Sequence, residues 1–149
     1  MAHAARPPVT APPDESAEAL RRRRVLVVDD NRDAADSLCL VLTLLGADVR
    51  VAYGGKEALE AMASWHPSVV LLDIGMAGMD GYEVARRVRQ QPDLGDVHLV
   101  ALTGWGQERD RRESIEAGID RHVTKPIDVD ALKALLGSLL RTPRASVSL

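Results

Sequence analysis

Five times along the sequence, a short apolar run is followed by an amphipathic segment. The apolar runs span 25–29, 48–52, 68–73, 97–103 and 119–124. The amphipathic segments span 31–45, 55–65, 81–91, 107–117 and 130–141. The runs have the length and β-branched content of strands covered on both faces, whereas the segments carry apolar residues at helical spacing. Five strand–helix units predict an α/β domain in which helices cover both faces of a parallel sheet.

The number of units favours one of the two common strand orders of doubly wound sheets. Five units fit the flavodoxin-like order 2-1-3-4-5 better than the six-stranded order of the dinucleotide-binding fold. We therefore expect a doubly wound, five-stranded parallel sheet with five helices. In that order the topological switch point lies between the first and third strands, and a ligand would bind at the carboxyl ends of the strands there.

The segments outside the strand–helix units have the composition of tails. Four of the eight prolines lie in residues 1–23, close to a run of arginines over 21–24. Such a segment buries too little apolar surface to offset its ordering entropy, so we expect a disordered tail over 1–23. The domain itself is predicted to span 24–141, with a frayed tail over 142–149. Because the chain ends soon after the last predicted helix, we expect no output domain.

Composition restricts the cellular location and the classes of binding partner that we expect. The formal net charge is −3 over 149 residues, so we expect no direct binding to nucleic acid. No apolar run reaches the roughly 18–20 residues of a membrane span, so no membrane association is expected. The first residues lack the apolar core of a secretory signal, and the single cysteine, Cys39, fits a reducing compartment. We expect a cytoplasmic location.

Polar side chains stand at the ends of four of the five predicted strands. They are Asp29, Asp30, Asp73, Thr103 and Lys125. Three carboxylates at one sheet edge repel one another and require a cation or raised pKa values, and oxygen ligands in an open site suit Mg²⁺. With a divalent cation and the ammonium, the formal charges sum to zero. Such a site can accept a phosphoryl group, with a carboxylate as the nucleophile.

Five motifs give this chain a family resemblance. They are VLVVDDN at 25–31, LLDIGMAGMDGYE at 71–83, ALTG at 101–104, AGID at 117–120 and TKP at 124–126. In order and spacing they resemble the receiver domain of two-component response regulators, over residues 24–141.

The resemblance implies a role for each polar residue. Asp73 would be the phosphoacceptor, Lys125 would bind the phosphoryl oxygens, and Thr103 would be the switch hydroxyl that moves toward the phosphate. The ligands of Mg²⁺ or Mn²⁺ would be Asp29, Asp30, Asp73 and the carbonyl of Gly75. The peptide bond before Pro126 would be cis.

The chain also departs from the family pattern. Ala77 stands where the family usually has proline, which frees the backbone of the loop after the acceptor. Gly75, Gly104 and Trp105 occupy other loop positions that would modulate the lifetime of the phosphorylated state. His122 stands at the position of the switch aromatic, where an imidazole could add pH sensitivity.

The function implied is a phosphorylation-dependent switch in a two-component system or phosphorelay. The phosphoryl group would come from a phosphohistidine of a histidine kinase or phosphotransfer protein. The surface of the fourth helix, fifth strand and fifth helix would then change for an unknown downstream protein, in a monomer or a phosphorylation-dependent homodimer. Exposed Leu40 on the first helix would help to dock the phosphodonor. The only enzymatic activities expected are self-phosphorylation and autodephosphorylation.

Two alternatives remain open at this point. The chain could be a degenerate receiver that binds partners without phosphorylation, or a phosphate sink. A conventional aspartyl phosphatase is disfavoured, because that chemistry usually places a second aspartate where Gly75 stands.

Overall fold

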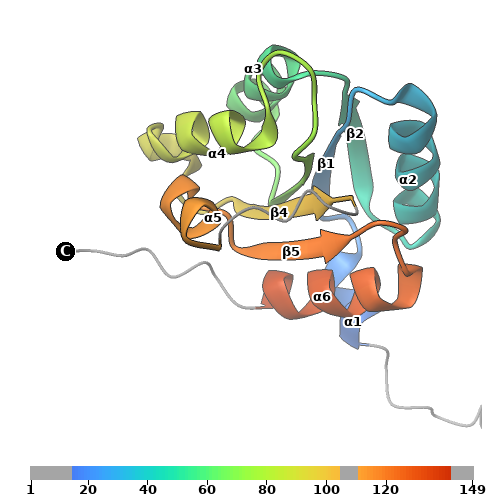
Figure 1. The fold of residues 1–149 in the computed structure, drawn as a ribbon. Helices are drawn as coiled ribbons and strands as arrows, with labels where there is room; N and C mark the ends of the chain where they lie inside the picture. The colour runs from blue at the N-terminus through green and yellow to red at the C-terminus, as the bar shows by residue number, and fades with distance from the viewer. Residues whose placement is uncertain (1–14, 105–110, 142–149) are drawn as a thin grey trace, which may run out of the picture.

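The computed structural model describes residues 15–104 and 111–141, which form a parallel sheet between two layers of helices (Figure 1). The strand order is β2-β1-β3-β4-β5, and all neighbours are parallel. The strands are β1 (Arg24–Val28), β2 (Asp48–Ala52), β3 (Val69–Asp73), β4 (His98–Thr103) and β5 (Arg121–Thr124). The predicted flavodoxin-like order 2-1-3-4-5 is confirmed.

The helices divide between the two faces of the sheet. The main helices are α2 (Arg32–Leu44), α3 (Gly55–Trp65), α4 (Gly81–Arg89), α5 (Arg111–Ala117) and α6 (Val129–Arg141). Side chains of α2 and α6 share one apolar core with β1, β3 and β4, and side chains of α3, α4 and α5 share the other (Figure 1). A short 3₁₀ turn, η1 (Pro92–Leu94), follows α4.

The central strands owe their apolar sequences to burial on both faces. Along β1, Val25 and Val27 belong to the core under α2 and α6, and Leu26 and Val28 to the opposite core. Every residue of β3 is buried. This is why these strands contain continuous apolar runs, since successive side chains point to opposite faces and both faces are covered.

Side chains cap the amino-terminal ends of α2 and α6, which follow β1 and β5. The Asn31 side chain accepts a hydrogen bond from the Ala34 N–H at the start of α2. Asp128 accepts bonds from two main-chain N–H groups of the first turn of α6, as an N-cap residue does. Gly46 ends α2 with a φ of 101°, a left-handed conformation that glycine adopts without a steric penalty.

The structure differs from the predicted tail over 1–23 at its carboxyl-terminal end. Residues 15–20 form a further helix, α1 (Glu15–Leu20), which packs beside α6. Leu20 is fully buried in the core shared with α2 and α6, and Ser16 lies against Gly137, which has no side chain to keep the two helices apart. The described residues therefore contain six α-helices rather than the five predicted. Leu20 is the one buried residue of α1, and six residues with a single buried apolar side chain show no helical periodicity in the sequence.

Several predictions fall outside the described residues. These are the placement of Trp105, the first residues of the helix predicted over 107–117, and the tails over 1–14 and 142–149. The fourth predicted helix is described from Arg111 as α5. Within the ranges that the structure describes, no helix is both long and apolar enough to cross a membrane.

Candidate functional site

Three carboxylates meet at the carboxyl edge of the sheet. Asp29 and Asp30 follow β1, and Asp73 is the last residue of β3; the two strands are paired, with Val28 opposite Leu72. One oxygen of each carboxylate lies within 4.8 Å of the others. Asp29 is 3% exposed and Asp73 6%, whereas Asp30 is open to solvent. The three carboxylates meet as predicted, because adjacent parallel strands end at the same edge of the sheet.

Main-chain N–H groups and one ammonium hold the two buried carboxylates. Asp29 Oδ1 accepts a hydrogen bond of 2.9 Å from the Asn31 N–H, and Asp73 Oδ1 accepts one of 3.2 Å from the Gly75 N–H. Lys125 Nζ lies 3.2 Å from Asp29 Oδ2 and 3.5 Å from Asp73 Oδ1. The structure thus brings Lys125, from the loop after β5, to the carboxylates as the sequence predicts.

The loop between β3 and α4 completes the carboxylate edge. The Ala77 N–H donates a hydrogen bond of 3.0 Å to Asp30 Oδ2. At the start of α4, a Cβ on Gly81 would lie 2.7 Å from the Asp73 carbonyl oxygen, so only glycine allows the helix to approach this closely. Gly81 lies within the motif at 71–83, but its packing role cannot be predicted from the motif.

The electrostatic environment raises the pKa of Asp73. Burial, which disfavours the charged carboxylate, is the main cause, and the negative charge of Asp29 adds to it. The Gly75 N–H and the Lys125 ammonium act in the opposite direction but do not cancel the effect. The negative charge of ionised Asp73 is therefore only partly compensated by its neighbours. A cation bound beside Asp73 would stabilise the charged form.

The donor set fits a hard divalent cation. Asp29, Asp30 and Asp73 offer only oxygen atoms, and exposed Asp30 leaves one side of the cluster accessible to water. Mg²⁺ prefers this arrangement, because it binds a few carboxylates and keeps several water ligands. These three aspartates could therefore hold Mg²⁺.

Thr103 and Lys125 are joined at the ends of β4 and β5. Thr103 is 3% exposed, and its hydroxyl donates a hydrogen bond of 3.4 Å to the Val123 carbonyl. Its own carbonyl accepts a bond of 2.7 Å from the Lys125 N–H. The Lys125–Pro126 peptide bond is cis. In this state the Thr103 hydroxyl is directed to β5 rather than hydrogen-bonded to Asp73.

His122 forms a polar chain that sequence reasoning missed. Its Nε2 lies 2.9 Å from the Ser114 hydroxyl on α5, and that hydroxyl donates to the Tyr82 hydroxyl on α4 across 3.4 Å. Ser114 and Tyr82 are buried, whereas His122 is exposed overall. No sequence spacing links these residues, because their hydrogen bonds depend on how α4, α5 and β5 pack together.

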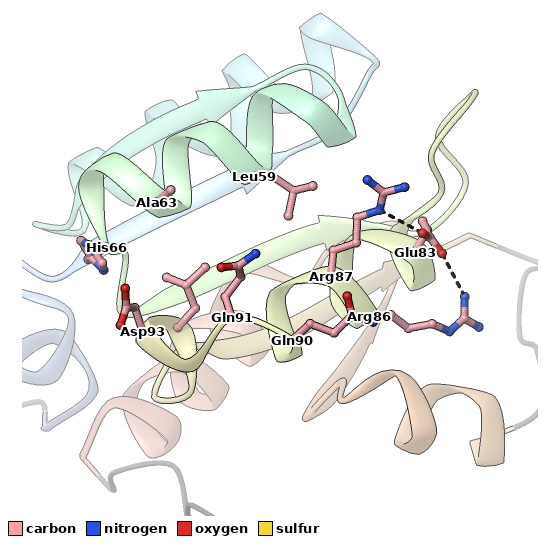
Figure 2. A pocket seen from close by; sticks show the side chains of 10 residues that line it. Leu59, Ala63, His66, Glu83, Arg86, Arg87, Gln90, Gln91 and Asp93 are labelled. Carbon is pink, nitrogen blue, oxygen red and sulfur yellow. Dashed lines mark hydrogen bonds and ion pairs between the residues drawn. The ribbon is translucent and has the colours of Figure 1, made fainter.

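One hollow in the surface adjoins the carboxylate edge, and a larger groove lies away from it. A groove of about 540 Å³ runs between α3 and α4, where Arg87 and Arg86 both pair with Glu83 (Figure 2). None of the polar strand-end residues lines it. A smaller hollow of about 290 Å³ adjoins the site, and Asp29 and Lys125 are among the residues that line it. Its apolar lining includes Ala34, Leu38, Val41, Leu102, Ile127 and Val129.

Comparisons with known proteins agree with this arrangement. The family model of the response regulator receiver domain matches residues 25–137. The chain is 37% identical over 111 residues to an uncharacterised 14.6 kDa protein from the sodA1 3′ region of Leptolyngbya boryana, covering 74% of this chain and 85% of that protein. It is 38% identical over 118 residues to the response regulator MprA of Mycolicibacterium vanbaalenii, covering 79% of this chain but 50% of MprA.

A solved structure gives the same result for the fold. The signal receiver domain of a signal transduction histidine kinase from Syntrophus aciditrophicus superposes with a TM-score of 0.73 at 29% identity, covering 85% of this chain and 99% of that one. Receiver domains generally bind Mg²⁺, carry the phosphoryl group on an aspartate and interact with histidine kinases or phosphotransfer proteins. The chain spans about half the length of MprA and of most other curated relatives it matches. With the family model covering most of its length, this chain belongs to the response regulator receiver domain family.

Proposed function

We propose that this chain is a phosphorylation-dependent signalling switch in which Asp73 accepts a phosphoryl group from a phosphohistidine. The observation that carries the proposal is the meeting of Asp29, Asp30 and Asp73 with Lys125 at one edge of the sheet. In this reaction a carboxylate oxygen of Asp73 attacks phosphorus, a P–O bond forms, and the P–N bond to the donor imidazole breaks. The electron pair of the P–N bond stays on the imidazole nitrogen.

The surrounding residues supply position and charge. Mg²⁺ bound by Asp29, Asp30, Asp73 and the Gly75 carbonyl would neutralise charge on the phosphoryl oxygens. Lys125, which now pairs with two carboxylates, has an ammonium that can bind a phosphoryl oxygen with little movement. Such preorganised charge accounts for most of the rate enhancement in reactions of this kind.

The switch would begin with the Thr103 hydroxyl. Its bond to the Val123 carbonyl is long, at 3.4 Å, so a phosphoryl oxygen on Asp73 is a stronger competing acceptor. A move of Thr103 toward Asp73 would shift the end of β4 against β5. His122, held to α5 through Ser114, would transmit this shift to the surface of α5, β5 and α6. A downstream protein or a second copy would bind that surface.

The hollow beside the carboxylates suits the phosphodonor. It is lined mainly by apolar side chains of α2 and of the segment that leads into α6, and Asp29 and Lys125 also line it. A helix of a histidine kinase or phosphotransfer protein seated there would present its phosphohistidine at the site. Leu44 continues the helical spacing of Ser37 and Val41 on this face, and Leu40 lies further around the helix. Both leucines are exposed, at 78% and 61%.

Peptide mapping tests this proposal. The protein is incubated with Mg²⁺ and a phosphoramidate, digested under acidic conditions, and mapped by mass spectrometry. A phosphoryl group on the peptide that contains Asp73, and its loss when Mg²⁺ is chelated, is the expected result. Phosphorylation elsewhere would contradict Asp73 as the acceptor, and no phosphorylation would favour a module that binds partners without phosphorylation.

A further inference from the structure

The hydrogen bond from Ala77 to Asp30 joins two segments that are far apart in sequence. The Ala77 N–H, in the loop between β3 and α4, donates to Asp30 Oδ2 across 3.0 Å. Among the residues that the structure describes, Ala77 is the one that donates a hydrogen bond to the Asp30 carboxylate. Asp30 is also the exposed member of the aspartate cluster, so water competes for its oxygens from the open side.

Each of the three carboxylates therefore accepts a hydrogen bond from a main-chain N–H, but the donors lie at different distances along the sequence. Asp29 and Asp73 each accept an N–H bond from a residue two positions later in the chain. The donor to Asp30 comes instead from the loop that follows Asp73. The orientation of Asp29 and Asp73 is a local property of their strand ends, whereas the orientation of Asp30 depends on the conformation of that loop.

We propose that the main-chain N–H of Ala77 positions Asp30 for the metal ion and thereby couples metal binding to the loop between β3 and α4. The inference rests on the proposed function, because it assumes that the aspartate cluster holds Mg²⁺. A carboxylate has two oxygens, and the N–H occupies Oδ2, which leaves Oδ1 available to the cation. The bond also removes rotamers in which an exposed aspartate would turn into solvent, so less entropy is lost when the ion binds.

The coupling acts in both directions. If an ordered loop strengthens Mg²⁺ binding, bound Mg²⁺ must stabilise the loop by the same free energy. The loop carries Gly75, whose N–H contacts Asp73, and leads into α4, whose first residue Gly81 packs on the Asp73 carbonyl. Mg²⁺ would therefore order the main chain around the acceptor through Asp30 and Ala77.

The alanine side chain has no part in this contact, which allows a matched set of variants. Ala77→Pro removes the N–H, whereas Ala77→Ser and Ala77→Gly keep it. Isothermal titration with MgCl₂ should show binding weakened by about three- to tenfold for Ala77→Pro, and by less than about twofold for Ala77→Ser. Equal or tighter Mg²⁺ binding by a folded Ala77→Pro variant would overturn the proposal.

A second variant separates the N–H from the proline ring. Lactic acid at position 77, introduced by nonsense suppression, replaces the N–H with an ester oxygen and leaves the side chain unchanged. Its Mg²⁺ affinity should match that of Ala77→Pro, and an affinity equal to the wild type would overturn the proposal even if Ala77→Pro does not fold.

Amide exchange reports on the bond itself, both in metal-free protein and after MgCl₂ is added. In metal-free protein, the Ala77 amide should exchange more slowly in the wild type than in Asp30→Ala, and MgCl₂ should slow it further in the wild type alone. Identical exchange in the two proteins would contradict the bond. If the wild type binds Mg²⁺ and accepts a phosphoryl group while the Ala77 variants do not differ, the inference fails and the proposed function stands. If the wild type binds no Mg²⁺, both fail.

Discussion

The ammonium nitrogen of Lys125 lies 3.5 Å from Oδ1 of Asp73, across the intervening strand β4. The same nitrogen lies 3.2 Å from Asp29 Oδ2, so one cation serves two buried carboxylates. An ammonium in this place compensates the carboxylates before reaction and can stabilise the added phosphoryl charge afterwards.

Lys125→Met removes that charge and retains much of the side-chain volume. We expect it to slow phosphorylation of Asp73 from a small phosphodonor by about tenfold or more, because preorganised charge at the reacting group is lost. The measurement is the initial rate of phosphoprotein formation at fixed Mg²⁺. The matched control is Lys133→Met, a lysine on α6 outside the site, which should leave the rate unchanged. An unchanged rate for Lys125→Met would contradict the assigned role.

Asp73 makes the metal-free protein less stable as pH rises. Its pKa in the folded state is raised, so between the ordinary value of 3.8 and the folded value the folded state binds more protons than the unfolded state. The free energy of unfolding therefore falls with rising pH over that interval. Asp73→Asn should melt a few degrees above the wild type at neutral pH without Mg²⁺, and the difference should shrink toward pH 4.

Thermal unfolding followed by circular dichroism across this pH range checks the prediction. Added Mg²⁺ should raise the melting temperature of the wild type more than that of Asp73→Asn, because the cation offsets the buried charge. A lower melting temperature for Asp73→Asn at neutral pH would show that ionised Asp73 is not a source of instability.

The polar residues of the site could be predicted from the sequence because strand ends determine their place. Asp29, Asp73 and Thr103 close apolar runs, and parallel strands bring all such ends to one edge. The same reasoning carries Lys125, directly after β5, to that edge. For these residues the backbone topology is sufficient, and no side-chain detail is required.

The contacts that depend on tertiary packing could not be predicted. The bond from Ala77 to Asp30 requires the path of an irregular loop, and the chain from His122 through Ser114 to Tyr82 requires the relative placement of two helices and a strand. The sequence did indicate that position 77 is unusual, since alanine stands where the family usually has proline. What the N–H of alanine does there appears only in the structure.

The helix α1 was missed because its signal is a single apolar residue. Leu20 would be exposed in an extended tail, but it is fully buried here in the core that it shares with side chains of α2 and α6. Leu20→Ala should lower the free energy of unfolding by about 2–4 kcal/mol, through lost burial and the cavity left behind. Leu44→Ala is the matched control, since Leu44 is 78% exposed and its removal should cost almost nothing. Equal stability of the two variants in urea titrations would show that α1 does not pack on α6 in solution.

Exposed leucines on α2 offer a test of phosphodonor docking. Leu40→Glu and Leu44→Glu should leave labelling by a small phosphodonor intact, because neither residue contacts the carboxylates. Both should slow transfer from a histidine kinase that phosphorylates the wild type. Leu44→Glu should have the larger effect, because Leu44 continues the helical spacing of Ser37 and Val41, which line the apolar hollow. The measurement is the transfer rate from phosphorylated kinase. Unchanged rates for both variants would place the docking surface elsewhere.

The most direct test of the account is the intact mass of the protein after incubation with Mg²⁺ and acetyl phosphate, beside Asp73→Asn. We expect the wild type to gain the mass of one phosphoryl group, and Asp73→Asn to gain none. The gain should disappear when Mg²⁺ is chelated. No gain by the wild type, or an equal gain by Asp73→Asn, would contradict the assignment of Asp73 as the phosphoacceptor.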